Sequence, residues 1–188
     1  MSGSGKIQVT PTAIHDVLVM EPRVFGDDRG WFTESFNAHD FLEATGLNVT
    51  FVHDNHSFSR QWTLRGLHYQ LEKTQGKLVR VVAGSVFDVA VDLRRDSPTF
   101  GKWVGVELSA ENHKQLWVPA GLAHGFLVLS ETAEFLYKTT DYYHPQSEAC
   151  LAWNDPQIAI SWPLPQGIPP NMNAKDSAGL AWDAAPKF

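Results

Sequence analysis

The chain has 188 residues, of which 43% are hydrophobic and 19% charged, and its formal net charge is −6 at pH 7. This balance predicts a folded protein of one domain and excludes a largely disordered chain. The negative charge without a basic run argues against nucleic acid as a partner, and no apolar run approaches the roughly 20 residues that a membrane-spanning helix needs.

The N-terminal residues MSGSG lack a hydrophobic signal core, so we expect a flexible tail and no secretion or membrane partner. Beyond them, apolar and polar residues alternate in many short runs separated by Gly, Pro, Asn or Asp, which is typical of an all-β sandwich or barrel. About ten short strands predict a two-sheet jelly roll with a ligand-binding mouth. The expected strands are residues 14–19, 31–36, 50–58, 64–70, 78–83, 86–92, 103–108, 116–118, 125–128 and 133–139.

One short helix is expected after residue 37. Asn37 is its predicted N-cap, Phe41 and Leu42 form its predicted buried face, and Gly46 is its predicted stop. A second short helix is expected after Asn154-Asp155-Pro156.

The C-terminal part is a Pro-rich extension, so the expected organisation is one domain over residues 1–188 with an N-terminal β arm and this tail. The stretch PLPQGIPPN cannot pair as a central strand and should run over the surface, carrying the segment AKDSAG to a target. Cys150 is the only cysteine, which excludes an internal disulfide and suits a reducing, cytoplasmic location.

A histidine and a lysine stand at the ends of adjacent predicted strands in the stretch RGLHYQLEKTQGKLVRVVAG. A partly buried Lys77 could stabilise negative charge on a ligand, whereas His68 alone is more often a core or surface residue. Alternation places His68 and Arg65 on opposite faces of their strand. If both serve one ligand, the strand needs a bulge, and Gly66 is the natural place for it.

The stretch VPAGLAHGF has the spacing PxGxxH before an apolar strand, which resembles the second motif of the cupin superfamily of jelly rolls. Many cupins hold a metal with an HxH pair, a Glu and a histidine at the position of His124. Here His68 is followed by Tyr69 and Gln70, so the second histidine is missing. Because catalytic metals usually have three protein ligands, we expect no metal and no other cofactor. A site made of His68 and His124 remains the alternative.

In the stretch EFLYKT, Tyr137 shares a face with Phe135 and Thr139. A phenol with a pKa of ~10 can give a proton to a strongly basic carbanion and recover it from solvent. Read from this strand alone, a packing tyrosine is the favoured interpretation.

Together these pieces resemble the dTDP-4-dehydrorhamnose 3,5-epimerases over residues 27–176. The matching stretches are DDRGWFTESF, DNHSFS, LRGLHYQ, QGKLVRVVAGSVFDVAVDLR, SPTFG, LWVPAGLAHGF, EFLYKTTDYY and NAKD. The resemblance implies a cupin-type jelly roll acting as a homodimer without a metal. It also implies a dTDP-sugar substrate, dTDP-4-dehydro-6-deoxy-D-glucose, whose C3 and C5 are inverted to give dTDP-4-dehydro-L-rhamnose.

The resemblance further assigns residue roles. His68 is implied as the general base with Asp176 as its carboxylate, Tyr137 as the acid on the opposite face, and Lys77 as the cation beside the C4 oxygen. Tyr143 matches a ring that stacks on thymine, and we expect the N-terminal strands to bring two of the binding residues, Arg29 and Glu34, to a partner subunit's ligand. The residues implied in substrate binding are Arg29, Glu34, His53, Asn55, Arg65, His124, Tyr143, Glu148 and Lys175.

Three other functions remain open from the sequence. Some relatives invert only one carbon, and another relative with this fold moves the keto group between C3 and C4. From a different class comes a non-catalytic jelly-roll protein that binds sugars. Recognition alone needs no base and acid on opposite walls, so the combination of His68, Tyr137 and Lys77 favours an enzyme.

Overall fold

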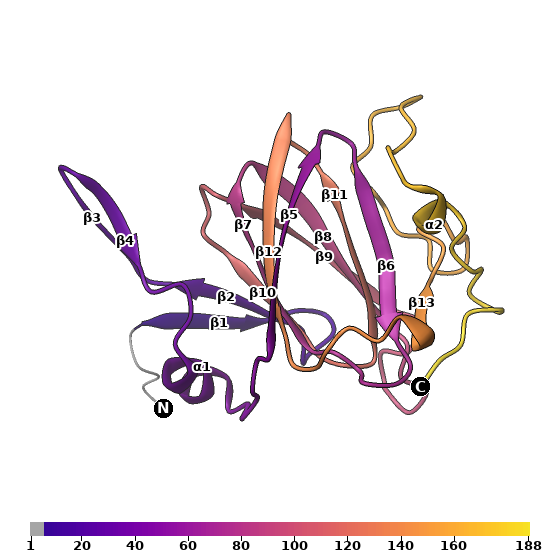
Figure 1. The fold of residues 1–188 in the computed structure, drawn as a ribbon, viewed down its shortest axis with the longest axis horizontal. Helices are drawn as coiled ribbons and strands as arrows, with labels where there is room; N and C mark the ends of the chain where they lie inside the picture. The colour runs from indigo at the N-terminus through magenta and orange to yellow at the C-terminus, as the bar shows by residue number, and fades with distance from the viewer. Residues whose placement is uncertain (1–5) are drawn as a thin grey trace.

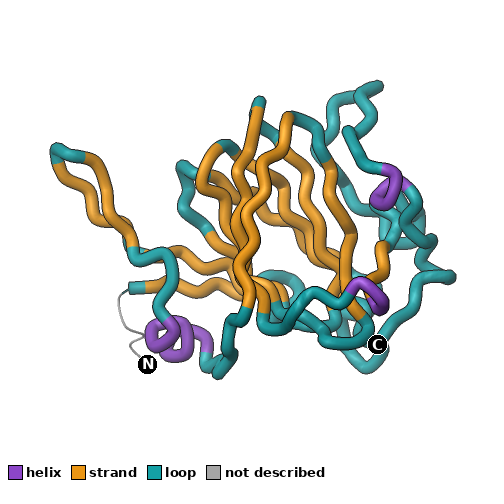
Figure 2. Tube along the Cα trace, in the orientation of Figure 1, coloured by secondary structure: helices purple, strands orange, loops and turns teal. Residues whose placement is uncertain are grey.

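The computed structural model describes residues 6–188, so the expected flexible tail MSGSG lies outside the described residues. Within that range the chain is built almost entirely of strands (Figures 1 and 2). The strands are β1 (Ile7–Pro11), β2 (Leu18–Pro22), β3 (Val24–Asp27), β4 (Gly30–Thr33), β5 (His53–Arg60), β6 (Leu64–Gln70), β7 (Lys77–Ala83), β8 (Ser85–Asp92), β9 (Trp103–Ser109), β10 (Gln115–Val118), β11 (Leu122–Val128), β12 (Thr132–Thr139) and β13 (Glu148–Cys150). The helices are α1 (Ala38–Thr45), the 3-10 turn η1 (Pro145–Ser147) and α2 (Ala174–Ser177).

Two antiparallel sheets face each other and form the predicted jelly roll. One sheet has the order β1-β2-β10-β7-β12-β5, and the other has the order β13-β6-β11-β8-β9. The hairpin β3–β4 belongs to neither sheet and projects from the body on the side away from α2, as an N-terminal arm (Figure 1). The all-β jelly-roll prediction is therefore confirmed.

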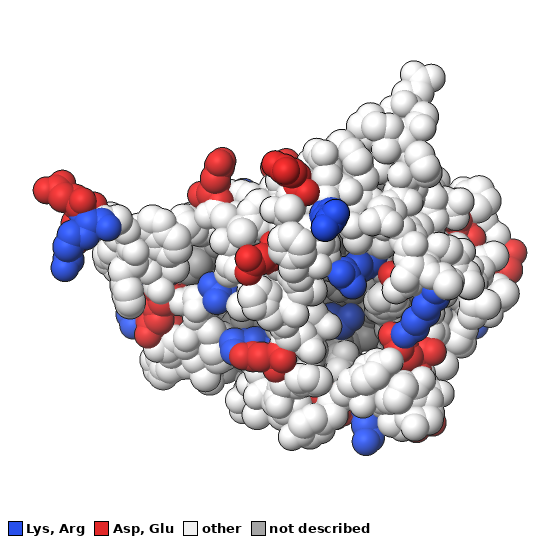
Figure 3. Space-filling model, turned by 45° about the horizontal axis from the view of Figure 1, so that its top comes forward, with Lys and Arg blue, Asp and Glu red and all other residues white. Residues whose placement is uncertain are grey.

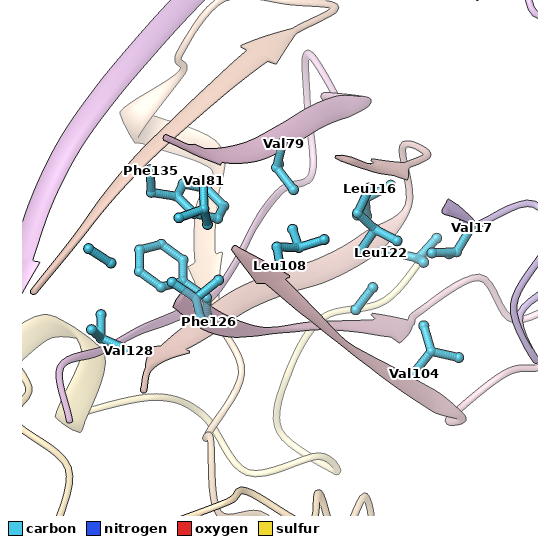
Figure 4. Close-up of a cluster of buried hydrophobic side chains, with 14 of the residues drawn as sticks. Val17, Val79, Val81, Val104, Leu108, Leu116, Leu122, Phe126, Val128 and Phe135 are labelled. Carbon is cyan, nitrogen blue, oxygen red and sulfur yellow. The ribbon is translucent and has the colours of Figure 1, made fainter. Parts of the chain in front are cut away.

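The main core lies between the two sheets. Val79, Val81 and Phe135 point inward from the six-stranded sheet and meet Leu108 and Phe126 from the other sheet (Figure 4). The rings of Phe126 and Phe135 stack with centroids 4.2 Å apart. Each side chain of this size stabilises the fold by about 1.5–3 kcal/mol when it leaves water, so this layer fixes the two sheets relative to each other.

The outer face of the five-stranded sheet is covered by the C-terminal extension. Leu67 and Tyr69 on β6 pack in one buried cluster with Ile158 and Ala185 of the extension. The hydroxyl of Tyr69 donates to the carbonyl oxygen of Pro186 at 2.8 Å. The expected surface path of this segment is confirmed, and its target is the sheet edge at β6 and β13.

Most predicted strands match within two or three residues, and the strand at 64–70 matches in full. The strand expected over residues 14–19 is wrong, because residues 12–17 form a turn between β1 and β2. In that turn the side chains of Ile14 and Val17 are fully buried in the main core. An apolar pair can therefore close the end of the barrel without pairing as a strand. The strand expected over 31–36 ends at Thr33.

The helix α1 begins and ends as predicted. The side chain of Asn37 accepts hydrogen bonds from the backbone N–H groups of His39 and Asp40, and Gly46 adopts a left-handed φ of 73°. Its predicted buried face is wrong at Leu42, which is 41% exposed. Asp40 is buried in its place, with its carboxylate 3.0 Å from the ammonium of Lys6.

The second predicted helix is also wrong, because residues 154–159 form turns. The carboxylate of Asp155 accepts hydrogen bonds from the backbone N–H groups of Gln157, Ile158 and Trp182. These bonds connect the beginning of the C-terminal extension to its end. The extra helix is instead α2, inside the AKDS stretch. None of the helices in the described range combines the length and the apolar character needed to cross a bilayer.

Candidate active site

A bulge in β6 shapes one wall of the candidate site. His68 pairs with His124 on β11, and Arg65 pairs with Phe126. The two paired residues are three positions apart on β6 but only two positions apart on β11, so β6 contains one extra residue. A Cβ at Gly66, whose φ is +115°, would lie 2.7 Å from the carbonyl oxygen of His124. Only glycine fits this close approach. The bulge predicted at Gly66 is therefore confirmed, and it allows Arg65 and His68 to project from the same face.

The imidazole of His68 and the carboxylate of Asp176 form a short hydrogen-bonded pair. Its Nε2 lies 2.5 Å from Oδ1 of Asp176, which is carried by α2. The backbone N–H of Asp176 donates to the side chain of Asn173 at 2.7 Å, so the helix cap fixes the carboxylate. Asp176 is nearly fully buried, whereas the side chain of His68 is 30% exposed. The arrangement can set the tautomer of His68 and stabilise its protonated form.

The opposite wall comes from the six-stranded sheet. Tyr137 on β12 lies opposite Val79 on β7, and Thr139 lies opposite Lys77. Tyr137 and Val79 both contact the core between the sheets, so this face of β12 and β7 looks toward β6 and β11. Lys77 and Tyr137 therefore belong to one sheet and His68 to the other.

Burial changes the proton affinity of both groups on this second wall. Burial lowers the pKa of Lys77 to about 8, and the carboxylates of Asp88 and Glu148 oppose that change. Burial raises the pKa of Tyr137, and the charge of Arg65 opposes the rise. The phenol is therefore protonated at neutral pH, while Lys77 is a cation close to its titration point.

A buried pair, Asp88 and His124, lies between the two sheets near Lys77. Nε2 of His124 lies 2.9 and 3.0 Å from the two carboxylate oxygens of Asp88. Burial raises the pKa of Asp88, against the opposing effects of His124 and Lys77. Sequence reasoning missed Asp88. Asp88 could have been found because it alternates with Val86 and Ala90, so the predicted strand turns its side chain toward the core. An unpaired charge there would be strongly destabilising, which predicts a partner for Asp88.

The carboxylate of Glu148 on β13 interacts electrostatically with His68 on one wall and with Lys77 on the other. It accepts a hydrogen bond from the hydroxyl of Tyr143 at 2.6 Å and pairs with the ammonium of Lys175. Burial would raise the pKa of Glu148, but the hydrogen bonds from Lys175 and Tyr143 outweigh it and leave the pKa below its ordinary value. The carboxylate is thus charged and raises the pKa of Lys77 across the site.

A cavity with basic side chains in its lining lies next to Asp176. A cavity of about 470 Å³ is lined by Arg60, Arg65, Asn173 and Asp176 among others. Figure 3 shows basic side chains gathered around a hollow in the face that includes the upper ends of the strands. Such a surface suits an anionic ligand that enters between the sheets.

Four of the expected binding residues lie on or next to the β3–β4 hairpin or on the edge strand β5. Arg29 is at the tip of the β3–β4 hairpin, paired with Asp27 at 2.5 Å, and Glu34 follows that hairpin. Asn55 on the edge strand β5 lies opposite Tyr137. His53 begins the same strand, and its buried Nδ1 has no hydrogen-bond partner among the described residues.

The alternative metal site at His68 and His124 has no third ligand in the part of the chain that the structure describes. Two groups there bring three potential ligands together, His68 with Cys150 and Asp176, and His39 with Asp40 and Glu43. Neither group includes His124, whose Nε2 contacts Asp88 instead.

The family model described as dTDP-4-dehydrorhamnose 3,5-epimerase matches residues 11–183. The chain belongs to this family. A dTDP-4-dehydrorhamnose 3,5-epimerase from Pseudomonas aeruginosa is 59% identical over 182 residues, which cover 97% of this chain and 99% of the relative. The corresponding enzyme from Salmonella typhimurium is 60% identical over 178 residues, covering 94% of this chain and 96% of the relative.

A solved member of the dTDP-4-dehydrorhamnose 3,5-epimerase family has the same fold. The dTDP-6-deoxy-D-glucose-3,5-epimerase of Legionella pneumophila, in complex with dTDP-4-keto-L-rhamnose, has a TM-score of 0.90 and 50% identity, covering 97% of this chain and 98% of that chain. The predicted family and the predicted enzyme class, an isomerase, are confirmed. These relatives give no support to a non-catalytic sugar-binding protein.

Proposed function

We propose that this epimerase inverts C3 and C5 of dTDP-4-dehydro-6-deoxy-D-glucose and so forms dTDP-4-dehydro-L-rhamnose, within dTDP-L-rhamnose biosynthesis. The relatives that are 59% and 60% identical carry the name of the double epimerase rather than of a single-site enzyme. The observation that carries the proposal is that His68, paired with Asp176 of α2, lies on one sheet, while Tyr137 and Lys77 lie on the other.

The first step is removal of a proton from carbon. A C–H bond beside the C4 ketone is acidic because its anion spreads onto the ketone oxygen. His68 takes this proton, and Asp176 stabilises the imidazolium that results. The ammonium of Lys77 holds the negative charge that develops on the C4 oxygen, and loss of such a donor typically lowers the rate ~10²–10³-fold.

The second step returns a proton to the other face of the sugar ring. Tyr137 extends from the opposite sheet, and its raised pKa keeps the phenol protonated until the enolate forms. The phenol gives its proton to the carbon and recovers one from solvent, while His68 releases the proton that it took. The same pair of residues serves C3 and C5 in turn, because both carbons flank the ketone.

The remaining residues of the site are assigned to binding. Arg65 and Lys175 suit the diphosphate, because their cations pair with its oxygens. The half-exposed ring of Tyr143, fixed by its hydrogen bond to Glu148, suits stacking on thymine. His124, which is held by Asp88, is assigned to donate a hydrogen bond to the sugar. The reaction so described needs no metal and no other cofactor.

We also propose that the active form is a homodimer in which Arg29 and Glu34 complete the partner subunit's site. Three large side chains of the β3–β4 hairpin, Phe25, Trp31 and Phe32, are 49%, 62% and 67% exposed. Apolar side chains gathered on an arm, together with the free edge of β5, are features that a second subunit would cover. Nδ1 of His53 on β5, which has no partner within residues 6–188, is consistent with such an interface.

Mixed dimers of two defective variants test the shared site. If Arg29 acts in the partner's site, dimers of Arg29→Ala with His68→Ala contain one site with both defects and one intact site. An equimolar mixture refolded together should then recover roughly a quarter of wild-type activity. No recovery would place Arg29 in its own chain's site, and a fully active monomer in sedimentation would contradict the dimer itself.

A cytoplasmic location completes the proposal. Cys150 has no second cysteine with which to form a disulfide in the chain, which suits a reducing compartment. Fractionation of cells that produce the enzyme checks this location.

The function itself is tested by incubating the enzyme with dTDP-4-dehydro-6-deoxy-D-glucose in D₂O and following the sugar by NMR. Deuterium at both C3 and C5, with the L-configured product, is the expected result. Deuterium at one position only would assign a single-site epimerase, and no exchange at either position would contradict the enzymatic reading.

A further inference from the structure

Cys150 lies directly beside the proposed catalytic pair. It pairs with His68 across β13 and β6, so the two side chains project from the same face of the sheet. A ring nitrogen of His68, the sulfur of Cys150 and a carboxylate oxygen of Asp176 all lie within 4.8 Å of one another. The thiol makes only a weak contact, with the carbonyl oxygen of Leu151 at 3.7 Å.

Imidazole, thiolate and carboxylate are the side-chain donors that zinc prefers. Zinc bonds of about 2.0–2.3 Å put tetrahedral ligand atoms roughly 3.3–3.8 Å apart. The 2.5 Å contact between His68 and Asp176 must therefore open by roughly 1 Å, and any ligand atoms that lie 4.8 Å apart must approach by about 1 Å. Cys150 and Asp176 are buried while His68 is partly exposed. The group therefore has three protein ligands, and its exposed side is at His68.

The second candidate cluster lacks these properties. His39 and Glu43 are exposed on α1, and the carboxylate of Asp40 pairs with Lys6. It also has no sulfur ligand. It therefore serves as a control for weak binding of cations to surface carboxylates and imidazoles.

We propose that His68, Cys150 and Asp176 form a binding site for a thiophilic divalent cation such as Zn²⁺, and that the bound ion inhibits the epimerase. On binding, the cation replaces the shared proton between His68 and Asp176, and the thiol of Cys150 releases its proton to solvent as the sulfur–metal bond forms. Binding of the ion stands on this geometry alone. Its inhibitory effect rests on the proposed role of His68, because the ion occupies the lone pair that would take the substrate's proton.

Cobalt reports the binding without any activity measurement. Co²⁺ bound through sulfur gives a strong charge-transfer absorption, and Cys150 is the only cysteine in the chain. Such a band in the wild-type enzyme, saturating at one ion per chain, therefore assigns Cys150 as a ligand. We expect the band to be lost in Cys150→Ala and Cys150→Ser and to be unchanged in His39→Ala.

Zinc inhibition is then compared in the same four proteins. Because Zn²⁺ also binds the diphosphate of the substrate, each variant is measured at the same zinc and substrate concentrations. Wild type and His39→Ala should lose activity, and a chelator should restore it. Cys150 takes no part in the proposed proton transfers, so both Cys150 variants should be active without zinc and need at least ~10-fold more zinc for half inhibition.

The outcomes separate the two halves of the proposal. Cobalt binding without a sulfur band, or equal zinc sensitivity of wild type and the folded Cys150 variants, overturns the site. If Cys150→Ala does not fold by circular dichroism, Cys150→Ser, which keeps the size but not the soft donor, decides the question. A sulfur band in an enzyme that keeps full activity with zinc bound overturns the inhibition and the assignment of His68 as the base, while the metal site stands.

Discussion

His68 and Asp176 are 108 residues apart in the sequence, yet Nε2 of the imidazole lies 2.5 Å from the carboxylate. The contact depends on the whole C-terminal extension, which crosses the outer face of the five-stranded sheet before α2 reaches the edge of β6. A flexible tail would not hold a buried carboxylate at this distance. The extension therefore belongs to the proposed active site as much as the strands do.

Substitution of either member of this pair should abolish proton removal. We expect His68→Ala to lower kcat by roughly 10²–10⁴-fold, since a general base contributes that much. Exchange of deuterium into C3 and C5 should fall with it. Asp176→Asn should lose a comparable factor because the amide no longer stabilises the imidazolium. Retained exchange in His68→Ala would show that another residue is the base.

The alkaline limb of the pH–rate profile should report Lys77. Burial lowers its pKa to about 8, whereas the pKa of Tyr137 is raised from 10, so Lys77 loses its proton first. If the cation stabilises the enolate, kcat should decline above pH 8 in the wild type. In Lys77→Arg, whose guanidinium stays charged, the remaining activity should persist to higher pH. A wild-type rate that is constant between pH 8 and 10 would contradict this role.

The same shift has a consequence for stability. The pKa of Lys77 falls from 10.5 in the unfolded chain to about 8 in the fold, so between these values the unfolded state binds more protons. The contribution of Lys77 to the free energy of unfolding therefore rises with pH across this interval, and its destabilising effect is fully present below pH 8. Lys77→Met should be more stable than wild type at neutral pH, and urea titrations should show this advantage shrinking toward pH 10.5. A stability difference between Lys77→Met and wild type that does not change with pH would contradict the burial of a charged Lys77.

Asp88 should act through its neighbours rather than on the substrate. Its carboxylate opposes the effect of burial on Lys77 and holds His124 by both oxygens. Asp88→Asn should therefore move the alkaline limb of the pH–rate profile to lower pH, because the pKa of Lys77 falls further, and should raise KM, because His124 is no longer held. A smaller amount of folded protein would change neither quantity. An unchanged profile in the folded variant would leave Asp88 with a packing role only.

Activity should survive removal of metal ions. The proposed proton transfers use an imidazole, a phenol and an ammonium, so dialysis against a strong chelator should leave kcat unchanged or relieve inhibition by trace zinc. Loss of activity that a defined metal restores would bring back a metal-dependent cupin mechanism.

The sequence predicted those parts of the site that depend on local pattern. Strand alternation predicted that Tyr137 shares a face with Phe135, and in the structure both residues contact the main core. The need for a bulge pointed to Gly66. Asn37 and Gly46 marked the helix correctly because caps are local interactions.

What depends on distant contacts was not readable from pattern. Asp176 came from the family resemblance, since no periodicity connects it with His68. Asp88 was missed because its partners His124 and Lys77 lie on other strands. The buried turn at residues 14–17 has the apolar pattern of a strand, because the residues that close the end of the barrel are as apolar as those that fill a sheet.

The central claim is that proton removal and proton return occur on opposite walls of one cavity. Tyr137→Phe tests it most directly, because the change removes one hydroxyl and keeps the ring that packs near Phe135. With dTDP-4-dehydro-6-deoxy-D-glucose in D₂O, we predict that this variant still exchanges hydrogen at C3 and C5 through His68 but forms little inverted product. Equal loss of exchange and inversion in Tyr137→Phe, or inversion at the wild-type rate, would contradict the assignment of the two walls.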